Sequence, residues 1–417
     1  MYPRGMRISQ EAKIVSVASG LTCLAGMQGG WIGPLIPSIA RAQHLTLVEA
    51  GLIVSVNMVG AMIMNVLGKF LVDKFGGPNC MKAASFVMAL GLAGLGFSQG
   101  FYLLCLSGLT WGLGAGLNGM ASTTTILANA DKVAASALNR LNVFFGVGAL
   151  LGPAAAWAAI TYKLGYPAVF ALGSCWGLIM MCITLTFKPE SARVQKREQD
   201  IVARSMQDGE GQLSDSAVLR SRQKFLRQPA LWLFAFIIFL YVGMEASCSA
   251  WLFTFLQKQA HLNMALCSIS MSTLWIGLTL GRLFSVSLTK RFSPFLISAI
   301  AACCVIVAVT TLCAIGRPGV MALAVVLLLG MGFGPIYPNN VASANQRFKE
   351  NLSTTSMIVI TAGSIGGTLI PMAVGYAFTK IGMVFGMSSL AVLAFLLLST
   401  VGLLTARPRA VRNLVWN

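Results

Sequence analysis

One carboxylate, Glu245, falls inside a long apolar segment of this sequence. Its surroundings form a polar strip, Tyr241-Val-Gly-Met-Glu245-Ala-Ser247-Cys-Ser249-Ala-Trp251. In a helix, Tyr241 and Ser249 lie one turn before and one turn after Glu245 and share its face. An ionisable side chain in a membrane segment is costly, so it indicates a functional site. Glu245 could exchange a proton or accept hydrogen bonds from hydroxyl groups. The alternative is a carboxylate that is hydrogen-bonded to another helix.

Other polar and aromatic residues in apolar segments could bind a polar solute. Gln28 and Trp31 are three residues apart, which places an amide and an indole on nearly the same helix face. Amides bind hydroxyl groups and indoles cover the apolar faces of sugars. The alternative for these residues is a structural contact between helices. We predict that ten residues bind the solute and that Glu245 also exchanges a proton: Gln28, Trp31, Asn118, Asn142, Tyr241, Glu245, Ser249, Trp251, Trp275 and Asn340.

Motifs for other chemistry are missing from the sequence. There is no GxxxxGK[ST] phosphate loop, so the chain is not expected to hydrolyse ATP. The ten cysteines are scattered, and His44 and His261 fall in loops, so neither a metal site nor structural disulfides are expected. We predict no cofactor and no enzymatic activity. A proton gradient would then drive solute movement, with a sodium ion or simple uniport as alternatives.

The composition predicts a membrane protein. The chain has 417 residues, of which 56% are hydrophobic and 10% charged, whereas a soluble domain has about 25% charged residues. Its apolar runs are long enough to cross a bilayer as helices and do not alternate as barrel strands do. We predict an all-α protein with twelve transmembrane helices over 14–38, 47–72, 79–98, 101–127, 138–161, 167–188, 229–256, 265–288, 294–314, 319–344, 354–376 and 383–405.

The net charge of +18 reflects membrane topology. If the N-terminus is cytoplasmic, the outer loops hold five of the thirty basic residues, which leaves twenty-five on the inner side. This is the positive-inside pattern, so we predict cytoplasmic termini, a lipid bilayer as partner and no nucleic-acid binding. We further predict a monomer in the plasma membrane, specifically a bacterial inner membrane. Besides Glu245, no ionisable residue is expected near the membrane centre, which favours a neutral or weakly charged solute.

The chain divides into two halves that repeat. Residues 189–228 are polar and predict a cytoplasmic linker between six-helix bundles at 1–188 and 229–417. Gly26-Met-Gln28 matches Gly243-Met-Glu245 at an offset of 217, and Gly112-Leu-Gly-Ala-Gly matches Gly330-Met-Gly-Phe-Gly at 218. A nearly constant offset indicates two pseudo-symmetric bundles with a solute site between them and alternating access.

The segment after the second predicted helix, Gly68-Lys-Phe-Leu-Val-Asp73-Lys74-Phe-Gly-Gly77, resembles the cytoplasmic signature of the major facilitator superfamily, although Lys69 stands where glycine is expected. Trp275-Ile-Gly-Leu-Thr-Leu-Gly-Arg282 and Gly334-Pro-Ile-Tyr337-Pro resemble the branch that contains fucose:proton symporters. The resemblance implies a gate on the cytoplasmic side, made of charged residues that lie in cytoplasmic loops or at the inner ends of helices. We assign to it Asp73, Lys74, Arg140, Arg282, Lys290 and Arg291.

These features predict a secondary active transporter. The leading hypothesis is proton-coupled symport, the uptake of a small polar organic solute such as a sugar. The first alternative is export of drugs or metabolites by proton antiport, and the second is a receptor or assembly factor that does not transport. Many drug:proton antiporters of the superfamily have an arginine in the middle of the fourth helix, which this sequence lacks.

Overall fold

The computed structural model describes residues 4–129, 134–187, 225–316, 319–348 and 351–405. In this part of the chain there are twelve long helices and no strand, which confirms the predicted all-α fold. They are α1 (Arg4–Ala42), α2 (Leu47–Phe75), α3 (Gly77–Phe97), α4 (Phe101–Asn129), α5 (Ala134–Thr161), α6 (Gly165–Leu185), α9 (Pro229–Lys258), α10 (Met264–Leu288), α11 (Pro294–Ala314), α12 (Met321–Arg347), α13 (Leu352–Lys380) and α14 (Met383–Thr405).

Local sequence signals set several helix ends. Thr46 and Glu49 form a reciprocal capping box at the start of α2. Asn263 and Ser293 cap α10 and α11 through their side chains. A single residue, Gly76, separates α2 from α3, and its φ of 80° is a conformation that favours glycine. The connections between these helices are therefore short and sharply turned.

Among the described residues, ten helices are long and apolar enough to cross a membrane. The two others are α1 and α4. Helix α1 contains Gln28, Pro34 and Pro37, and α4 carries Asn118 together with several serines and threonines. The chain is a multi-pass membrane protein.

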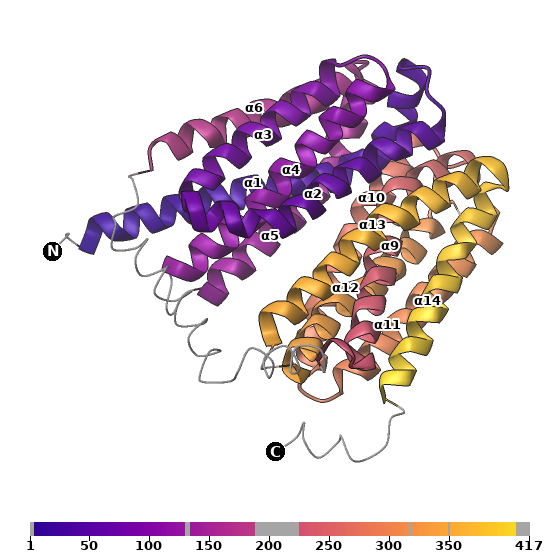
Figure 1. Ribbon diagram of the computed structural model, residues 1–417. Coiled ribbons are helices and arrows are strands. Elements are labelled where there is room, and N and C mark those ends of the chain that lie inside the picture. Colours follow the sequence, from indigo (N-terminus) through magenta and orange to yellow (C-terminus); the bar gives the residue numbers. More distant parts are fainter. Residues whose placement is uncertain (1–3, 130–133, 188–224, 317–318, 349–350, 406–417) are drawn as a thin grey trace.

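The helices form two bundles. Helices α1–α6 pack together as the N-terminal bundle, and α9–α14 pack together as the C-terminal bundle (Figure 1). The predicted linker lies outside the described residues apart from 225–228, where the Phe225 ring contacts Phe348 at a centroid distance of 5.5 Å. This end of the linker belongs to the C-terminal bundle.

The repeated glycines lie at matching helix crossings in the two bundles. A Cβ atom on Gly112 of α4 would collide with the carbonyl oxygen of Asn57 on α2. A Cβ atom on Gly330 of α12 would collide in the same way with Leu274 on α10. Small residues allow such close approach of helix backbones in membranes. Gly116 and Gly334 also lie at close crossings, as do Gly148 and Gly366, which match each other at an offset of 218.

The bundles are closest on one side of the protein. Helix α1 begins and α14 ends on the same side, here called the termini side, and the two bundles diverge toward it (Figure 1). The contacts between bundles run from the opposite side to about mid-helix. They include Gly51 with Trp251, Ser272 Oγ with the Leu150 carbonyl oxygen at 3.2 Å, Phe145 with Trp275, and Asn65 Nδ2 with Ser364 Oγ at 3.5 Å.

Candidate functional site

Three polar side chains of the C-terminal bundle lie around Glu245. Tyr241 lies one turn before Glu245 on α9, and its ring is 5.9 Å from that of Tyr337 on α12. Gly334, three residues before Tyr337, brings α12 against the backbone nitrogen of Arg282 on α10. Three helices therefore supply one carboxylate, one guanidinium and two phenols, which we call the Glu245 cluster.

The two charges of the Glu245 cluster interact electrostatically. Among the described residues, Arg282 is the only cation that lies close enough to Glu245 to interact with it electrostatically. Tyr241 lies close enough to interact with both Glu245 and Arg282. No ion pair within 4.0 Å joins Glu245 to Arg282 in the described part of the chain. The Tyr241 hydroxyl is buried between the two charged groups and has Glu245 and Arg282 as its polar neighbours. A hydroxyl in this place can donate one hydrogen bond and accept others, so a polar solute could also bind to it.

Arg282 lies deeper in the bundle than the sequence predicts. We expected it among charged residues that face the cytoplasm, and its gating role stays a prediction. Arg282 is partly buried, however, whereas Lys290 and Arg291 are exposed. It lies six residues before the end of α10, or about 9 Å along the helix. A long side chain on such a residue can extend back into the bundle.

The Glu245 cluster lies on the face of α9 that meets the N-terminal bundle. Ser249, one turn after Glu245, has its carbonyl oxygen against Gly33 of α1 at a crossing too close for a Cβ atom. Its hydroxyl donates a 3.0 Å hydrogen bond to the Glu245 carbonyl oxygen. Glu245 is more exposed than Ser249 and the residues that follow it in the tightly packed part of α9. The carboxylate is therefore placed where the two bundles begin to separate.

Trp275 of α10 also lies at the contact between the bundles. Its ring packs edge-on against Phe145 of α5 at 5.8 Å, and a Cβ atom on Gly29 of α1 would lie 3.6 Å from it. The indole nitrogen is buried and makes no hydrogen bond. Gln28, next to Gly29, is also buried. Trp275 and Gln28 are therefore compatible with the predicted binding role.

Four other predicted binding residues pack elsewhere. Trp31 is fully buried in the N-terminal bundle, edge-on to Phe170 at 6.1 Å. Asn340 donates hydrogen bonds to Ser298 Oγ and to the Ile336 carbonyl oxygen, which directs it toward α11. Two further residues complete the set: Asn118, which accepts a bond from Ser122 within α4, and Trp251, which contacts α2 and α13. The structure does not bring these four side chains to the Glu245 cluster.

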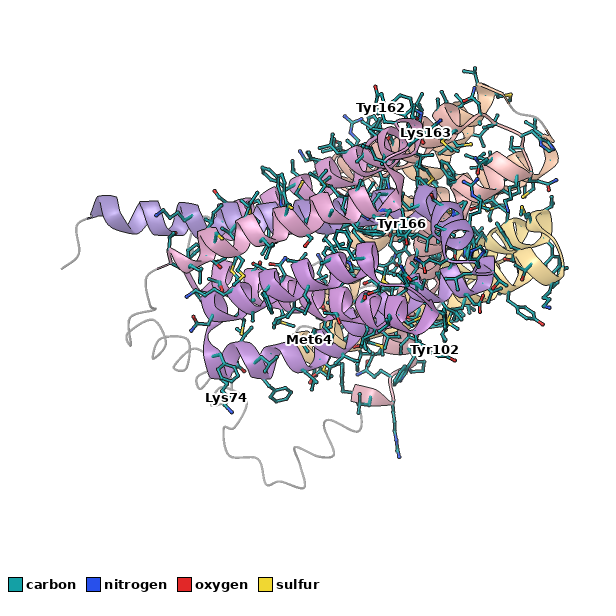
Figure 2. All side chains as sticks on the ribbon, turned by 90° about the horizontal axis from the view of Figure 1, so that it is seen from above. Met64, Lys74, Tyr102, Tyr162, Lys163 and Tyr166 are labelled. Atoms are coloured by element: carbon teal, nitrogen blue, oxygen red, sulfur yellow. The ribbon has the colours of Figure 1, made fainter. Side chains whose placement is uncertain are left out.

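The predicted gate residues Asp73, Lys74, Lys290 and Arg291 are exposed on the termini side. Figure 2 shows the Lys74 side chain at the end of its helix, away from Tyr162 and Lys163 at the other end of the bundle. Among the described residues, none of the four forms an ion pair within 4.0 Å. The side chains of Arg140 and Asn142 lie outside the described part of the chain.

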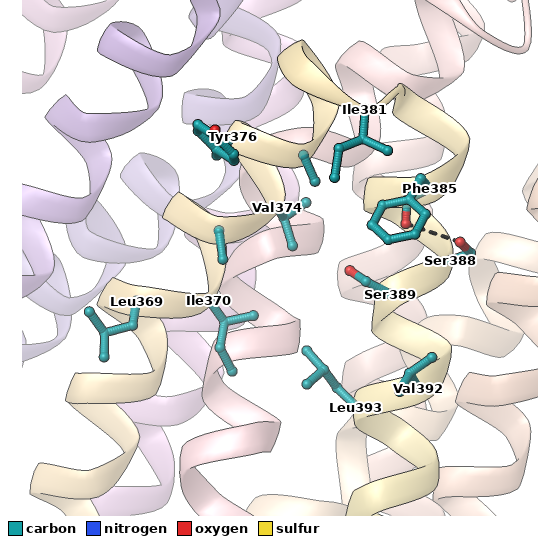
Figure 3. Close-up of a pocket in the computed structure, with 12 residues that line it drawn as sticks. Leu369, Ile370, Val374, Tyr376, Ile381, Phe385, Ser388, Ser389, Val392 and Leu393 are labelled. Carbon is teal, nitrogen blue, oxygen red and sulfur yellow. Dashed lines mark hydrogen bonds between the residues drawn. The ribbon is translucent and has the colours of Figure 1, made fainter.

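A groove of about 610 Å³ lies between α13 and α14 (Figure 3), and no residue of the Glu245 cluster lines it. Its lining is almost entirely apolar, and the hydroxyls of Ser388 and Ser389 donate to carbonyl oxygens of their own helix at 3.0 Å and 2.7 Å. Leu369 and Val392 in this lining are 52% and 61% exposed, so the groove opens on the outer surface of the bundle. Apart from the Tyr376 hydroxyl, the side chains that line this groove are apolar or already bonded within their own helix.

Comparison with known proteins identifies the family. Residues 18–371 match the model of the Major Facilitator Superfamily. The chain belongs to the major facilitator superfamily. It is 24% identical over 380 residues to Bypass of stop codon protein 6 of Saccharomyces cerevisiae, and the alignment covers 86% of this chain and 75% of that protein. It is 22% identical over 370 residues, 88% of each chain, to the glucose/mannose transporter GlcP of Bacillus subtilis.

Solved members of the superfamily share the fold. A D-xylose–proton symporter aligns with a TM-score of 0.74 at 16% identity, over 93% of this chain and 97% of that one. The family and its transporter relatives show that this superfamily member is a transporter of small molecules and not an enzyme.

Proposed function

We propose that this transporter takes up a small, polar, neutral organic solute such as a sugar, coupled to protons through Glu245. The observation that carries the proposal is the Glu245 cluster on the face of the C-terminal bundle that meets α1. Alternating access between two bundles requires a site at their interface. A carboxylate at that interface can bind a proton and a solute in one transport cycle.

The charges in the cluster favour a neutral solute. Glu245 and Arg282 carry opposite charges, so a neutral solute adds no unbalanced charge to a partly buried site. Carboxylate, guanidinium, phenol and indole groups together offer both acceptors and donors to hydroxyl groups. The glucose and mannose named for one relative and the D-xylose and proton named for a solved neighbour agree with this assignment.

The arrangement of the bundles supports a cycle in which both halves rock about the interface. The described contacts between bundles lie on the side opposite the termini. Among the described residues, Asp73, Lys74, Lys290 and Arg291 on the termini side form no ion pair within 4.0 Å. If the excess of basic residues marks the cytoplasmic side, the structure represents a state that opens toward the cytoplasm. Ion pairs between the gate residues would then form when this side closes.

Transport by purified protein in liposomes tests the proposal. Ligands are first found by the thermal stabilisation that sugars, polyols, nucleosides and amino acids give to the protein. Glu245→Gln keeps the shape of the side chain but cannot release a proton. We expect it to lose accumulation against a gradient and to retain solute exchange, while exposed Lys258→Gln behaves as wild type. Full accumulation by Glu245→Gln would remove the coupling role. Solute efflux driven by an inward proton gradient would support the antiport alternative.

A further inference from the structure

The groove between α13 and α14 opens within the membrane-spanning part of the chain, since Thr354–Lys380 and Met383–Thr405 are both apolar enough to cross a bilayer. Helix α14 packs mainly on α9, α11 and α13, which all belong to its own bundle. Figure 1 shows α14 at the edge of the C-terminal bundle, away from the N-terminal bundle. Large apolar side chains are exposed along the length of α14, at Phe385, Val392, Phe395 and Leu403. We therefore expect the groove to meet the hydrocarbon chains of the bilayer.

The shape of the groove follows from the way in which the two helices meet. Near the start of α14, Gly386 packs so closely on the Phe378 ring of α13 that a Cβ atom would collide with it. From this contact the helices diverge, and Figure 3 shows Leu369 and Val392 on opposite walls at the far end. The volume of about 610 Å³ lies within the range of about 300–1,000 Å³ for ligand pockets. Walls of an empty groove would lose dispersion contacts, so a flexible apolar chain fits this space.

One end of the groove is polar. Tyr376 lines the groove, and Lys380 follows it by one helical turn, so both lie on the same face of α13. Both residues are exposed, and Lys380 forms no ion pair within 4.0 Å in the described part of the chain. A phenol and an ammonium group can together bind a phosphate through hydrogen bonds and charge attraction.

The length of the groove matches one leaflet of the bilayer. Leu369 lies near the middle of the span Thr354–Lys380, and Lys380 ends this span on the side opposite the termini. The two residues are eleven positions apart, or about 16 Å along the helix. Half of the hydrocarbon core of a bilayer is about 15 Å thick. A phospholipid with its phosphate at Lys380 therefore reaches Leu369 with its acyl chain.

We propose that this groove binds one phospholipid of the leaflet on the side opposite the termini. An acyl chain lies between α13 and α14, and the phosphate lies at Tyr376 and Lys380. Burial of the chain supplies affinity, because each buried CH₂ group contributes to it, and Lys380 adds attraction to the phosphate. None of the lining residues belongs to the Glu245 cluster, so the inference does not depend on the solute or on the coupling ion.

The α13 wall of the groove also packs against α9. A Cβ atom on Gly243 of α9 would collide with Ile370, which lines the groove. The next residue, Pro371, accepts the 2.9 Å hydrogen bond from the Trp251 indole. A bound acyl chain therefore presses on the outer face of the helix segment that holds Trp251. We expect the phospholipid to stabilise the packing of α13 on α9 and so to raise the unfolding temperature.

Native mass spectrometry of the purified, delipidated full-length transporter tests this site. Palmitoyl-oleoyl phosphatidylglycerol is added in steps, and the bound lipid is counted for wild type and variants. Ala373→Trp and Val392→Trp each place an indole in the groove, one from either wall, at exposed positions. Each should lower the affinity for the first phospholipid by at least about tenfold, because the indole displaces several CH₂ groups of the chain. Lys380→Gln should lower it by about fivefold, the effect of one lysine near a charged lipid.

Matched variants separate this site from general coating by lipid. Leu172→Trp adds an indole at an exposed apolar position of α6, and Lys163→Gln removes an exposed cation on the same side of the N-terminal bundle. Both should bind the lipid as wild type does. Phosphatidylglycerol should also raise the unfolding temperature of wild type by more than that of Ala373→Trp. Val392→Trp covers the case in which Ala373→Trp does not fold.

Three results would overturn the proposal. If both groove variants bind the phospholipid as tightly as wild type, the chain does not lie in the groove. If Leu172→Trp weakens binding as much as Ala373→Trp, the counted lipid only coats the surface. If palmitoyl-oleoyl-glycerol, which has the same chains without a phosphate, binds as tightly as phosphatidylglycerol, the phosphate does not lie at Lys380.

Discussion

The indole nitrogen of Trp251 donates a 2.9 Å hydrogen bond to the carbonyl oxygen of Pro371, which joins α9 to α13 within the C-terminal bundle. The ring then extends to the N-terminal bundle, where a Cβ atom on Gly51 of α2 would collide with it at 2.5 Å. Gly375 of α13 leaves room for the ring on the other side. Trp251 thus fills the bundle contact on the side opposite the termini, and this contact has to separate if the protein opens there.

We predict that a larger residue at Gly51 blocks closure on that side. Gly51→Val would overlap the Trp251 ring at a distance that packing cannot absorb, and such overpacking costs about 1–3 kcal/mol. Transport in liposomes should fall by at least about fivefold, since a cost of about 1 kcal/mol corresponds to about a fivefold change. Gly402→Ala is the matched control, because a Cβ atom at Gly402 meets nothing within 4 Å. Equal transport rates for Gly51→Val and wild type would contradict the role of this contact.

The glycine repeat leads to a prediction about stability. Gly112→Ala and Gly330→Ala each place a Cβ atom onto a backbone carbonyl of the neighbouring helix, so each should lower the thermal unfolding temperature. We expect a loss of about 1–3 kcal/mol for each of them. Gly119→Ala on the same helix as Gly112 has open space and should be neutral or stabilising by about 0.5 kcal/mol. Similar melting temperatures for all three variants would show that the repeat does not reflect close packing.

Hydropathy and repeats predicted the fold because both depend on properties that a single sequence contains. The apolar segments had to cross the bilayer as helices, and the glycines repeat because each half needs the same close crossings. The direction in which each helix face points depends on its neighbours, and the sequence does not contain that information. For this reason Gln28 and Trp31 share a predicted face, yet Trp31 packs on Phe170 in the bundle interior.

The depth of Arg282 was also beyond the sequence argument. A basic residue near a helix end normally indicates the cytoplasmic surface, and the exposed Lys290 and Arg291 follow this pattern. Arg282 differs because glycines at the α10–α12 crossing hold its backbone inside the bundle. The signal that could have revealed the burial of Arg282 is the preceding Gly281. It lies one helical turn after Gly277, and two glycines one turn apart mark a closely packed helix face.

Two of the three predicted tryptophans, Trp31 and Trp275, lie in different surroundings, which leads to a paired prediction. Trp275→Phe keeps an aromatic ring near Phe145 but loses the unpaired indole N–H. If the solute accepts a hydrogen bond from it, affinity should fall by about fivefold to tenfold, the effect of a bond worth about 1 kcal/mol. Trp31→Phe should lower thermal stability and leave affinity within about twofold. Affinities from ligand-dependent thermal shifts decide between them. If Trp31→Phe lowers the affinity and Trp275→Phe lowers only the thermal stability, Trp31 and not Trp275 would belong to the binding site.

The charges on the termini side give a prediction that separates gating from binding. Asp73 on α2 and Lys290 after α10 occupy equivalent positions of the repeat, at an offset of 217, and carry opposite charges. Both are exposed and lack an ion pair within 4.0 Å in the described structure, as expected for a state in which this side is open. Ion pairs formed on closure would favour the closed state without touching the solute.

Asp73→Asn and Arg291→Gln should therefore slow transport by about twofold to fivefold, since weakening one partly exposed ion pair shifts the balance of states by about 0.5–1 kcal/mol. Solute affinity should stay within about twofold of wild type, because neither residue belongs to the Glu245 cluster. Lys82→Gln is the control, a cation in the first turns of α3 whose hydrogen bond to Asn79 stays within one helix. Transport rates in liposomes and affinities from thermal shifts are measured on the same preparations. A loss of affinity that parallels the loss of transport would place these residues in the binding site and contradict the gating role.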